Sequence, residues 1–384
     1  MAIRTLGLIA GCDVLAMGTW FSASAVILPL ATAFGVAADD RGWITGAVQL
    51  GFVCGALVSA AIALADSIEP RALIRSGILV AVFANSAILV AHTPALLLAC
   101  RFLTGVGLAL VYPPTVRLLT ALYPRSRGVS TGIAVGALTL GSFSPHLLAG
   151  DLPWRGVVMG ASILALLGVP LSALIPRVQL PHVSRFDMRA IPRVFQNKNV
   201  LLADAGYWGH MWELYAVWAW APLFYQASAN AARAHVPSAV IVFTAFGIAG
   251  AAGCIVAGMF SDRFGRATVA GIALLISGIT SFSVGFLYGR DPWLLSIVFV
   301  IWGASVVADS AQFSVAVSEL APPQYAGSAL TFQMGVGFFI TLLTIWLVGA
   351  AQRELGWQFA FMLLSAGPAC GVAAMIALRR RCNV

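Results

Sequence analysis

Charged side chains are scarce in this 384-residue chain, in which Asp, Glu, Lys and Arg make up 9% of the sequence. A soluble globular domain carries about 25%. Hydrophobic residues make up 60% of the chain, and the mean hydropathy is +0.93. This composition excludes an ordinary soluble protein. Apolar runs of about 20 residues, which can cross roughly 30 Å of hydrocarbon as helices, recur along nearly the whole chain. The sequence therefore predicts an all-α polytopic membrane protein.

The motifs of several chemistries are also missing. The chain has no glycine-rich nucleotide loop, no metal-ligand spacing and no arrangement of a catalytic nucleophile with a base. Its six cysteines include no CxxC pair, so we expect small buried side chains and no disulfide framework. The sequence predicts a protein that is not an enzyme, with no catalytic residues, no metal and no cofactor.

Twelve membrane-spanning helices are expected from the apolar runs. Asp13 interrupts the first run, so we expect a retained first helix and not a cleaved signal peptide. The short alternating segments of an outer-membrane barrel are absent. The expected spans are residues 6–30, 42–65, 72–92, 95–119, 128–150, 156–176, 200–226, 237–260, 268–289, 293–317, 327–350 and 356–378.

Basic residues gather in alternate loops between these spans. With a cytoplasmic N-terminus, sixteen of the 22 lie on the inner side, five lie on the outer side, and Arg101 alone lies within a span. This positive-inside bias predicts cytoplasmic termini, and it explains the net charge of +8 without a nucleic-acid partner. We expect a multi-pass cell membrane protein that lies in the lipid bilayer of the bacterial inner membrane. We also expect it to function as a monomer.

The longest polar stretch divides the spans six and six. We expect an N-terminal six-helix bundle at 1–176, a cytoplasmic linker at 177–199 and a C-terminal six-helix bundle at 200–384. Segments of the two halves match at an offset near 200 residues, such as "WRGVVMG" at 154–160 and "WQFAFML" at 357–363. Such internal duplication is typical of transporters that work by alternating access, in which two bundles move about a site near the bilayer midplane.

The chain resembles the major facilitator superfamily over essentially its full length. "GMFSDRFGR" at 258–266 is similar to the cytoplasmic loop signature of that family, and "RFLTGVG" at 101–107 is similar to its fourth-helix signature. The N-terminal copy of the loop is degraded, because Glu69 stands where the signature has glycine. An aspartate in this loop can pair with a nearby arginine in one conformation and release it in another. The expected conformational-latch residues are Asp66, Arg71, Gly258, Asp262, Arg263, Gly265 and Arg266.

Ionisable side chains within membrane spans are costly and mark function. Those we single out lie on spans 1, 4, 7 and 10, which line the central cavity in the family that the chain resembles. Helical phase places aromatic or amide neighbours beside them, and His146 near the outer end of span 5 is a weaker candidate. The candidates for substrate binding and proton coupling are Arg101, His210, Glu213, Asp13, Asp309, Trp20, Tyr112, Gln312 and His146.

The chemistry of these groups separates their roles. Arg101 keeps its charge, so it can hold an anion or a carboxylate but cannot carry a proton through a cycle. His210 and Glu213 can exchange protons when buried, so we expect them to couple transport to a proton gradient. Two other readings stay open: a static pair of Arg101 with a carboxylate, and a histidine satisfied by a backbone carbonyl.

Depth along the helices gives a further expectation. At 1.5 Å per residue, Glu213 and Arg101 lie near the middle of the bilayer, about 20 Å from its inner boundary. His210 lies about 15 Å, Asp13 about 10 Å and Asp309 about 5 Å from that boundary.

We therefore expect a secondary active transporter that moves a small solute by alternating access, in symport or antiport with protons. "TWFSASAVILP" at 19–29 and "GALTLGSFSPHLL" at 136–148 look like the cyanate and nitrate/nitrite permease branch, which implies a small anion. The arginines that nitrate porters carry on spans 2 and 8 are absent, so cyanate or a small organic anion is the better expectation. The alternatives are a proton-coupled exporter of drugs or other hydrophobic compounds, and a non-transporting membrane sensor or channel.

Overall fold

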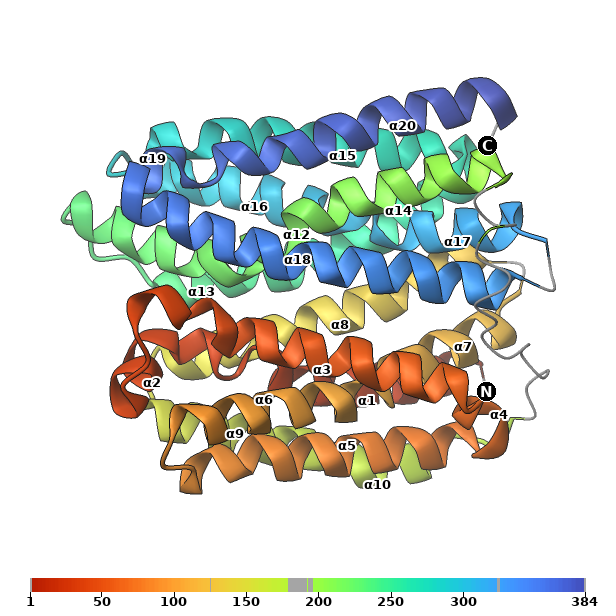
Figure 1. Ribbon diagram of the computed structural model, residues 1–384, viewed down its shortest axis with the longest axis horizontal. Coiled ribbons are helices and arrows are strands. Elements are labelled where there is room, and N and C mark those ends of the chain that lie inside the picture. Colours follow the sequence, from red (N-terminus) through yellow and green to blue (C-terminus); the bar gives the residue numbers. More distant parts are fainter. Residues whose placement is uncertain (1, 125, 179–191, 193–195, 323–324, 383–384) are drawn as a thin grey trace. The chain divides into compact units, whose positions relative to one another are not determined.

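A computed structural model describes residues 2–124, 126–178, 192, 196–322 and 325–382. Within these residues all regular structure is helical (Figure 1). By contacts the chain divides into two compact units. Unit 1 comprises Met1–Arg125 and Ala137–Arg185, and unit 2 comprises Ser126–Gly136 and Phe186–Val384. Most of the expected linker at 177–199 falls outside the described residues. The expected division at 1–176 and 200–384 stays a prediction.

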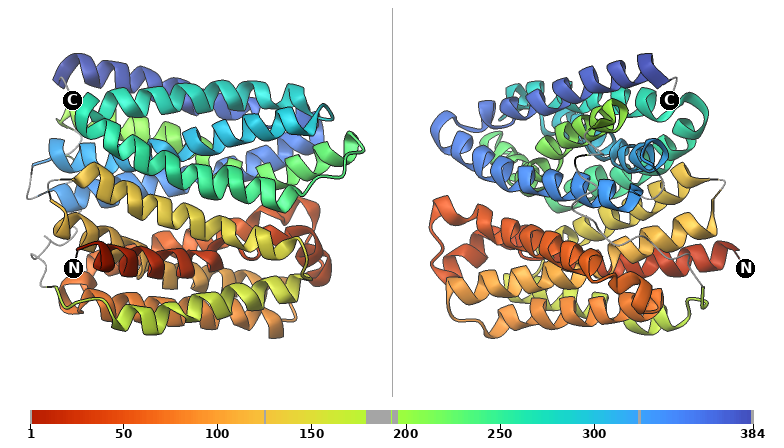
Figure 2. Two further views of the ribbon diagram at one scale, coloured as in Figure 1. Left: turned by 180° about the vertical axis from the view of Figure 1, so that it is seen from behind. Right: turned by 45° about the vertical axis from the view of Figure 1, so that its right-hand side comes forward.

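Within unit 1 the long helices run side by side along a common direction (Figures 1 and 2). Prolines at the first helical position, Pro70 and Pro94, start two of them, and the Thr93 side chain caps the second by accepting from the Leu96 amide. The helices are α1 (Ala2–Phe21), α2 (Ile27–Phe34), α3 (Gly42–Ala61), α4 (Leu64–Ser67), α5 (Pro70–Ala87), α6 (Pro94–Ala109), α7 (Tyr112–Leu122), the later part of α8 (Arg127–Ala149), α9 (Trp154–Leu166) and α10 (Gly168–Ala173).

Unit 2 is also built of long helices, and α12 packs against α20, α18, α17 and α16. A π-helical stretch, Phe243–Ala249, lies between α13 and α14. The helices are α12 (Lys198–Ala231), α13 (Ser238–Val242), α14 (Gly250–Phe264), α15 (Arg266–Ser283), α16 (Pro292–Ala308), α17 (Ser310–Leu320), α18 (Ala326–Leu355), α19 (Trp357–Ala360) and α20 (Ala366–Cys382). The first turns of α8 belong to this unit as well.

Eleven helical segments of the described chain are long and apolar enough to cross a membrane. They correspond to all the expected spans except the seventh. The seventh is present as α12, a 34-residue helix that is not among the eleven. Most of α12 is buried against α18, α20 and α17. A helix enclosed by protein need not be apolar all round, so α12 can carry acidic and imidazole side chains within a membrane protein.

Two of the interrupted spans carry candidate site residues. Span 4 is α6 followed by α7, and the break precedes Pro113 and Pro114, which cannot continue the hydrogen-bond ladder of the preceding turn. Span 10 is α16 followed by α17, and the break falls at Asp309, which ends one helix and begins the other. No proline or glycine marks this second break.

Candidate functional site

A buried histidine and aspartate meet where span 10 is interrupted. His210 Nδ1, on α12, lies 2.8 Å from Asp309 Oδ1, and each side chain is 1% exposed. Asp309 Oδ1 receives no hydrogen bond of acceptable geometry in the described structure, so the contact is an ion pair when the imidazole is protonated. The other ring nitrogen, Nε2, is buried without a hydrogen-bond partner among the described residues. His210 therefore has one nitrogen fixed by Asp309 and one available for a proton or a ligand.

Two aromatic rings lie beside this imidazole, and an amide side chain follows Asp309 by one helical turn. The rings of Tyr207 and Phe313 lie 6.1 and 5.7 Å from the ring of His210, centroid to centroid. Gln312 follows Asp309 by three residues, and therefore lies on the same face of the chain, one turn further along. Its amide oxygen and nitrogen are both buried and lack partners in the described structure. The four groups combine an ionisable base, a free amide and two ring faces. We call His210, Asp309 and Gln312 the imidazole cluster.

Glu213 is one turn further along α12 and has a different environment. Its carboxylate accepts from Ser277 Oγ at 2.8 Å and Ser281 Oγ at 2.5 Å on α15, and from Trp302 Nε1 at 3.0 Å on α16. The side chain is 1% exposed. Three donors satisfy a buried carboxylate, and they tie three helices together. Glu213 is thus held by unit 2 itself, with hydroxyl donors that can reverse their hydrogen bonds when the carboxylate gains a proton.

Sequence reasoning passed over Asp204, although it lies inside the expected seventh span. Asp204 is fully buried on α12, and its Oδ1 accepts from Gln333 Nε2 of α18 at 3.0 Å. Asp204 Oδ2 and Gln333 Oε1 are both buried without a hydrogen-bond partner among the described residues. The signal was present in the sequence, since any carboxylate within an apolar run is costly.

In unit 1, Arg101 on α6 is fully buried and donates only to oxygens that carry no formal charge. Its Nε donates to Ile44 O at 3.2 Å, and its terminal nitrogens donate to Thr19 O at 3.0 Å, to Asn85 Oδ1 at 3.4 Å and to Trp20 O. The guanidinium thus joins α6 to α1 and α3 through main-chain carbonyls, and to α5 through the side-chain amide of Asn85. This geometry describes a tie between helices, and a role for Arg101 in anion binding stays a prediction.

The other candidates of unit 1 are scattered. Asp13 is fully buried on α1, and neither carboxylate oxygen has a partner among the described residues. His146 is buried on α8, its ring lies 5.1 Å from that of Phe143, and its Nδ1 has no partner in the described chain. Trp20 packs on Phe52 with a centroid distance of 4.8 Å, and Tyr112 begins α7.

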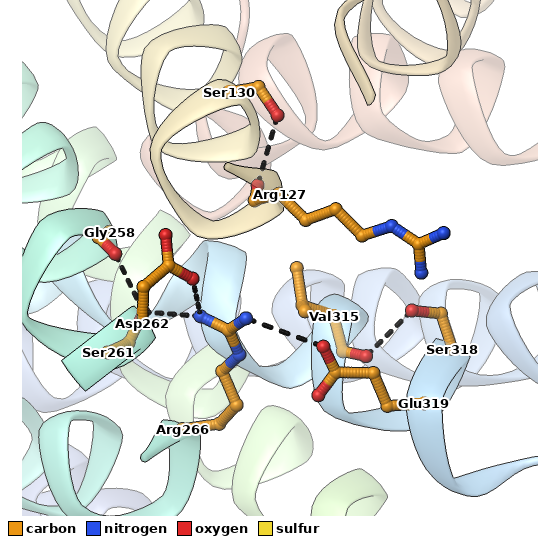
Figure 3. A network of polar contacts seen from close by, with 9 residues as sticks. All are labelled: Arg127, Ser130, Gly258, Ser261, Asp262, Arg266, Val315, Ser318 and Glu319. Carbon is orange, nitrogen blue, oxygen red and sulfur yellow. Dashed lines mark hydrogen bonds and ion pairs between the residues drawn. The ribbon is translucent and has the colours of Figure 1, made fainter. Parts of the chain in front are cut away.

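The loop signature of unit 2 forms a charged network (Figure 3). Arg266 Nη1 lies 2.5 Å from Asp262 Oδ1 and donates to Ser261 Oγ at 2.8 Å, while Nη2 donates to Glu319 Oε1 of α17 at 3.4 Å. Of the two arginines in this loop, Arg266 is the one that pairs with Asp262. Arg263 instead lies over the ring of Phe264, 5.2 Å from its centroid. The loop turns at Gly265, whose φ of +88° favours glycine.

The corresponding loop of unit 1 uses different partners. Arg71 Nε lies 2.7 Å from Glu69 Oε1, at the position where the signature has glycine, and Arg71 Nη1 donates to Ile175 O at 3.5 Å. The side chain of Asp66 lies outside the described residues. The remaining signature glycine, Gly258 on α14, faces the backbone of Gly128 on α8 closely enough that a methyl group would meet the carbonyl oxygen at 2.5 Å.

The expected depths of His210 and Asp309 were wrong. They were set about 10 Å apart, yet the two side chains touch. The inner end of span 10 lies at Leu320, three residues beyond the expected boundary, and α12 begins at Lys198, two residues before it. Counted from these ends, His210 and Asp309 both lie about 17 Å from the inner ends of their segments.

Comparison with known proteins identifies the family. The model of the Major Facilitator Superfamily matches residues 9–241, more than half of the chain, and the model described as "Sugar (and other) transporter" matches residues 203–380. The chain belongs to the Major Facilitator Superfamily. It is a multi-pass membrane transporter of this superfamily, as its composition and repeat predict.

Relatives and a solved structure agree with this assignment. The 4-hydroxybenzoate transporter PcaK of Pseudomonas aeruginosa is 25% identical over 391 aligned residues, which cover 91% of this chain and 84% of that protein. PcaK of Pseudomonas putida is 24% identical over 400 residues with the same coverage. The structure of the proton:xylose symporter XylE, bound to 6-bromo-6-deoxy-D-glucose, has a TM-score of 0.73 and 16% identity, and the match covers 97% of this chain and 95% of that one. The XylE match concerns the fold alone. None of these names points to the cyanate or nitrate/nitrite branch, so that resemblance stays a prediction.

Proposed function

We propose that this transporter carries a small aromatic carboxylate across the membrane together with a proton. The observation that carries the proposal is the imidazole cluster, in which a buried histidine offers Nε2 beside the rings of Tyr207 and Phe313. Similarity over 91% of this chain to transporters named for 4-hydroxybenzoate supports the same class of solute. Such a solute is a small organic anion, which is the wider class that the sequence predicts.

The chemistry of the cluster explains how proton and anion binding are linked. In the proposed cycle Nε2 takes up a proton while Nδ1 stays beside Asp309 Oδ1. The resulting Nε2–H becomes a donor with a positive charge, which suits a carboxylate. The Gln312 amide supplies a second hydrogen bond, and the two rings receive the flat face of the solute. Each partner increases the affinity for the other, because the coupling between two ligands is reciprocal.

Two further elements complete the proposal. Glu213 lies one turn from His210 and takes part in the proton step, with Ser277, Ser281 and Trp302 holding whichever form is present. The contacts of Arg266 with Asp262 and Glu319 hold the loop between α14 and α15 to α17, and they break when unit 2 changes conformation. The positive-inside bias supports a location in the bacterial inner membrane with both termini in the cytoplasm. We propose that a single chain is sufficient.

The test is flux into proteoliposomes that contain the purified protein. Radiolabelled 4-hydroxybenzoate, benzoate, cyanate, xylose and a cationic dye are compared with and without an imposed pH gradient. We expect uptake of the aromatic acids that rises with the gradient and that unlabelled benzoate inhibits. Uptake of cyanate in preference to benzoate would replace the aromatic proposal by the small-anion alternative. Transport of the dye alone would support the exporter alternative.

A pair of conservative variants separates substrate from coupling. His210→Asn removes the base while keeping a polar side chain, and Asp309→Asn removes the charge that fixes Nδ1. We expect Asp309→Asn to retain counterflow exchange of benzoate and to lose accumulation driven by the gradient, whereas His210→Asn, which also removes the proposed carboxylate donor, should lose both. Asp151→Asn changes an exposed carboxylate and is the matched control. Full accumulation in both cluster variants would overturn the proposed coupling.

A further inference from the structure

Asp204 and Gln333 form a second polar pair in unit 2, apart from the imidazole cluster. Asp204 lies six residues before His210 on α12, and Gln333 lies on α18. Both side chains are fully buried. One hydrogen bond joins them, from Gln333 Nε2 to Asp204 Oδ1 at 3.0 Å. The α18 backbone is tied to α12 at the same place, because Trp208 Nε1 donates to Gln333 O at 3.2 Å. Two helices of the unit are therefore joined by two bonds at one position.

If Asp204 is ionised, the two remaining oxygen atoms of this pair are both hydrogen-bond acceptors and cannot bond to each other. Asp204 Oδ2 and Gln333 Oε1 are acceptors, and neither receives a hydrogen bond from the described residues. A charged oxygen buried without a donor is strongly unfavourable, and so is a buried amide oxygen left unpaired. A proton on Oδ2 removes the charge and creates the donor that Gln333 Oε1 lacks. A carboxylic acid and a primary amide then satisfy each other with two parallel hydrogen bonds.

Other ionisable groups on the neighbouring helices do not supply that missing donor. Glu319 of α17 contacts Arg266, Arg381 of α20 donates to Asn199, and His210 contacts Asp309. In the described structure, Gln333 is the hydrogen-bond partner that Asp204 has. The remaining charged or titratable groups on α12 and on the helices that pack around its inner half are Lys198, Tyr207, Tyr325, Arg379 and Arg380.

We propose that Asp204 is a proton-binding site in its own right, and that its proton closes an acid–amide clasp between α12 and α18. Loss of the proton leaves a carboxylate facing an amide oxygen, so the clasp opens as the pH rises. The site is separate from the transported solute and its proton. It makes the packing of α12 against α18 sensitive to pH, whichever substrate the transporter carries.

Asp204→Asn is the decisive variant. An asparagine amide forms the same two-bond pair with Gln333 at any pH, so this variant keeps the clasp closed permanently. Infrared spectra of purified protein at neutral pH should show a C=O band of a protonated carboxyl group that is present in the wild type and missing from Asp204→Asn. Asp151→Asn, which alters an exposed carboxylate, should leave that band unchanged. If Asp204→Asn instead lost a band of an ionised carboxylate and kept the protonated carboxyl band of the wild type, the proposal would be overturned.

Thermal unfolding as a function of pH gives a second readout that does not depend on transport. Because the protonated form makes the extra bond, its stabilisation is present at low pH and lost as the pH rises through the titration of Asp204. We expect a smaller loss of thermal stability with rising pH in Asp204→Asn than in the wild type. Equal pH dependence in the two proteins would contradict the clasp.

Gln333→Met provides a test that does not require the asparagine variant to fold. It removes both amide partners but leaves Asp204 in an apolar place. The protonated carboxyl band should persist and move to higher frequency, since the acid loses its hydrogen bonds. An unshifted band would show that Gln333 does not contact the proton. Both outcomes are independent of the aromatic substrate, so failure of the clasp is distinguishable from failure of the proposed function.

Discussion

Arg101 in unit 1 and Glu213 in unit 2 are both buried at a junction of helices, and their hydrogen-bond partners differ in kind. In unit 1 the guanidinium of Arg101 donates to three main-chain carbonyls and to Asn85. In unit 2 the carboxylate of Glu213 accepts from two serine hydroxyls and the indole of Trp302. Main-chain carbonyls can only accept, so the first arrangement holds a permanent cation. Hydroxyl groups can donate or accept, so the second arrangement tolerates a change of protonation.

The same contrast extends to the groups around each ion. Unit 2 brings a histidine, two carboxyl groups and one amide into contacts along α12, through His210 with Asp309 and Asp204 with Gln333. In unit 1 the buried carboxyl group, Asp13, stands without a partner among the described residues. The comparison indicates that the static connection lies in the first unit and that most of the exchangeable protons lie in the second. The following predictions test this division, starting with the largest effect.

Replacing Arg101 by methionine should destabilise the protein most. Four acceptors in unit 1 lose the guanidinium as a donor, of which Thr19 O and Asn85 Oδ1 still receive the Ser22 hydroxyl. A buried acceptor left without a donor costs about 1 to 3 kcal/mol. We expect a loss on the order of 3 kcal/mol or more, seen as a large drop in the unfolding temperature in detergent. Arg101→Lys retains the charge and part of the donor set, so it should lose less. A methionine variant as stable as the wild type would show that the tie is not needed.

Close helix crossings offer a comparison between the units at matched positions. Gly105 of α6 lies against the backbone of Val48 in unit 1, and Gly303 of α16 lies against that of Ala245 in unit 2. A methyl group at either position would overlap a carbonyl oxygen, and overpacking costs about 1 to 3 kcal/mol. We expect Gly105→Ala and Gly303→Ala to lower the unfolding temperature similarly. Gly335→Ala is the control, because no atom lies within 4 Å of the added methyl group. A large drop in unfolding temperature for Gly335→Ala alone would contradict the close packing at Gly105 and Gly303.

Glu213→Gln should change stability by only about 1 kcal/mol, the usual scale of one net hydrogen bond. The amide oxygen keeps Trp302 as a donor, and a serine hydroxyl can rotate to accept from the new amide. Chemical denaturation or thermal unfolding measures this difference. In the same proteoliposomes, exchange should persist while accumulation driven by the pH gradient decreases. Destabilisation as large as that of Arg101→Met would mean that Glu213 is as static as the arginine.

The smallest effect is expected at the cytoplasmic loop of unit 2. Arg266→Gln removes contacts with Asp262 and Glu319, which are partly exposed to solvent, and exposed ion pairs contribute about 0 to 1 kcal/mol. Unfolding temperature should therefore change little. The transport rate should change more, because these contacts break during the conformational cycle. The control is Arg263→Gln, whose side chain contacts only the ring of Phe264 among the contacts described for it. Equal rates in the two variants would remove the network from the cycle.

The fold could be predicted largely because lipid imposes a simple rule on sequence. Long apolar runs, basic loops and the repeated segments indicate the class of fold without reference to side-chain contacts. The interruption of span 4 is also visible in the sequence, since Pro113 and Pro114 follow it. The interruption at Asp309 carries no such residue, which is one reason why its depth was misplaced.

The partners within the site could be predicted only in part. A polar residue within an apolar run is recognisable, so His210, Glu213 and Asp309 were found, and Asp204 satisfied the same criterion. Which of these side chains contact each other depends on how α12 is rotated and shifted against its neighbours. Several pairings of polar side chains are compatible with similar helical phases. His210 and Glu213 are three residues apart, yet His210 contacts the end of α16 while Glu213 contacts α15 and Trp302.

The central claim is that transport is coupled to a proton held by His210 and Asp309 in unit 2. The most direct measurement is benzoate accumulation in proteoliposomes under an imposed pH gradient, with exchange at equal pH measured in the same preparation. For Asp309→Asn we predict exchange close to that of the wild type and no accumulation. Accumulation equal to that of the wild type would contradict the claim and assign the coupled proton to another group.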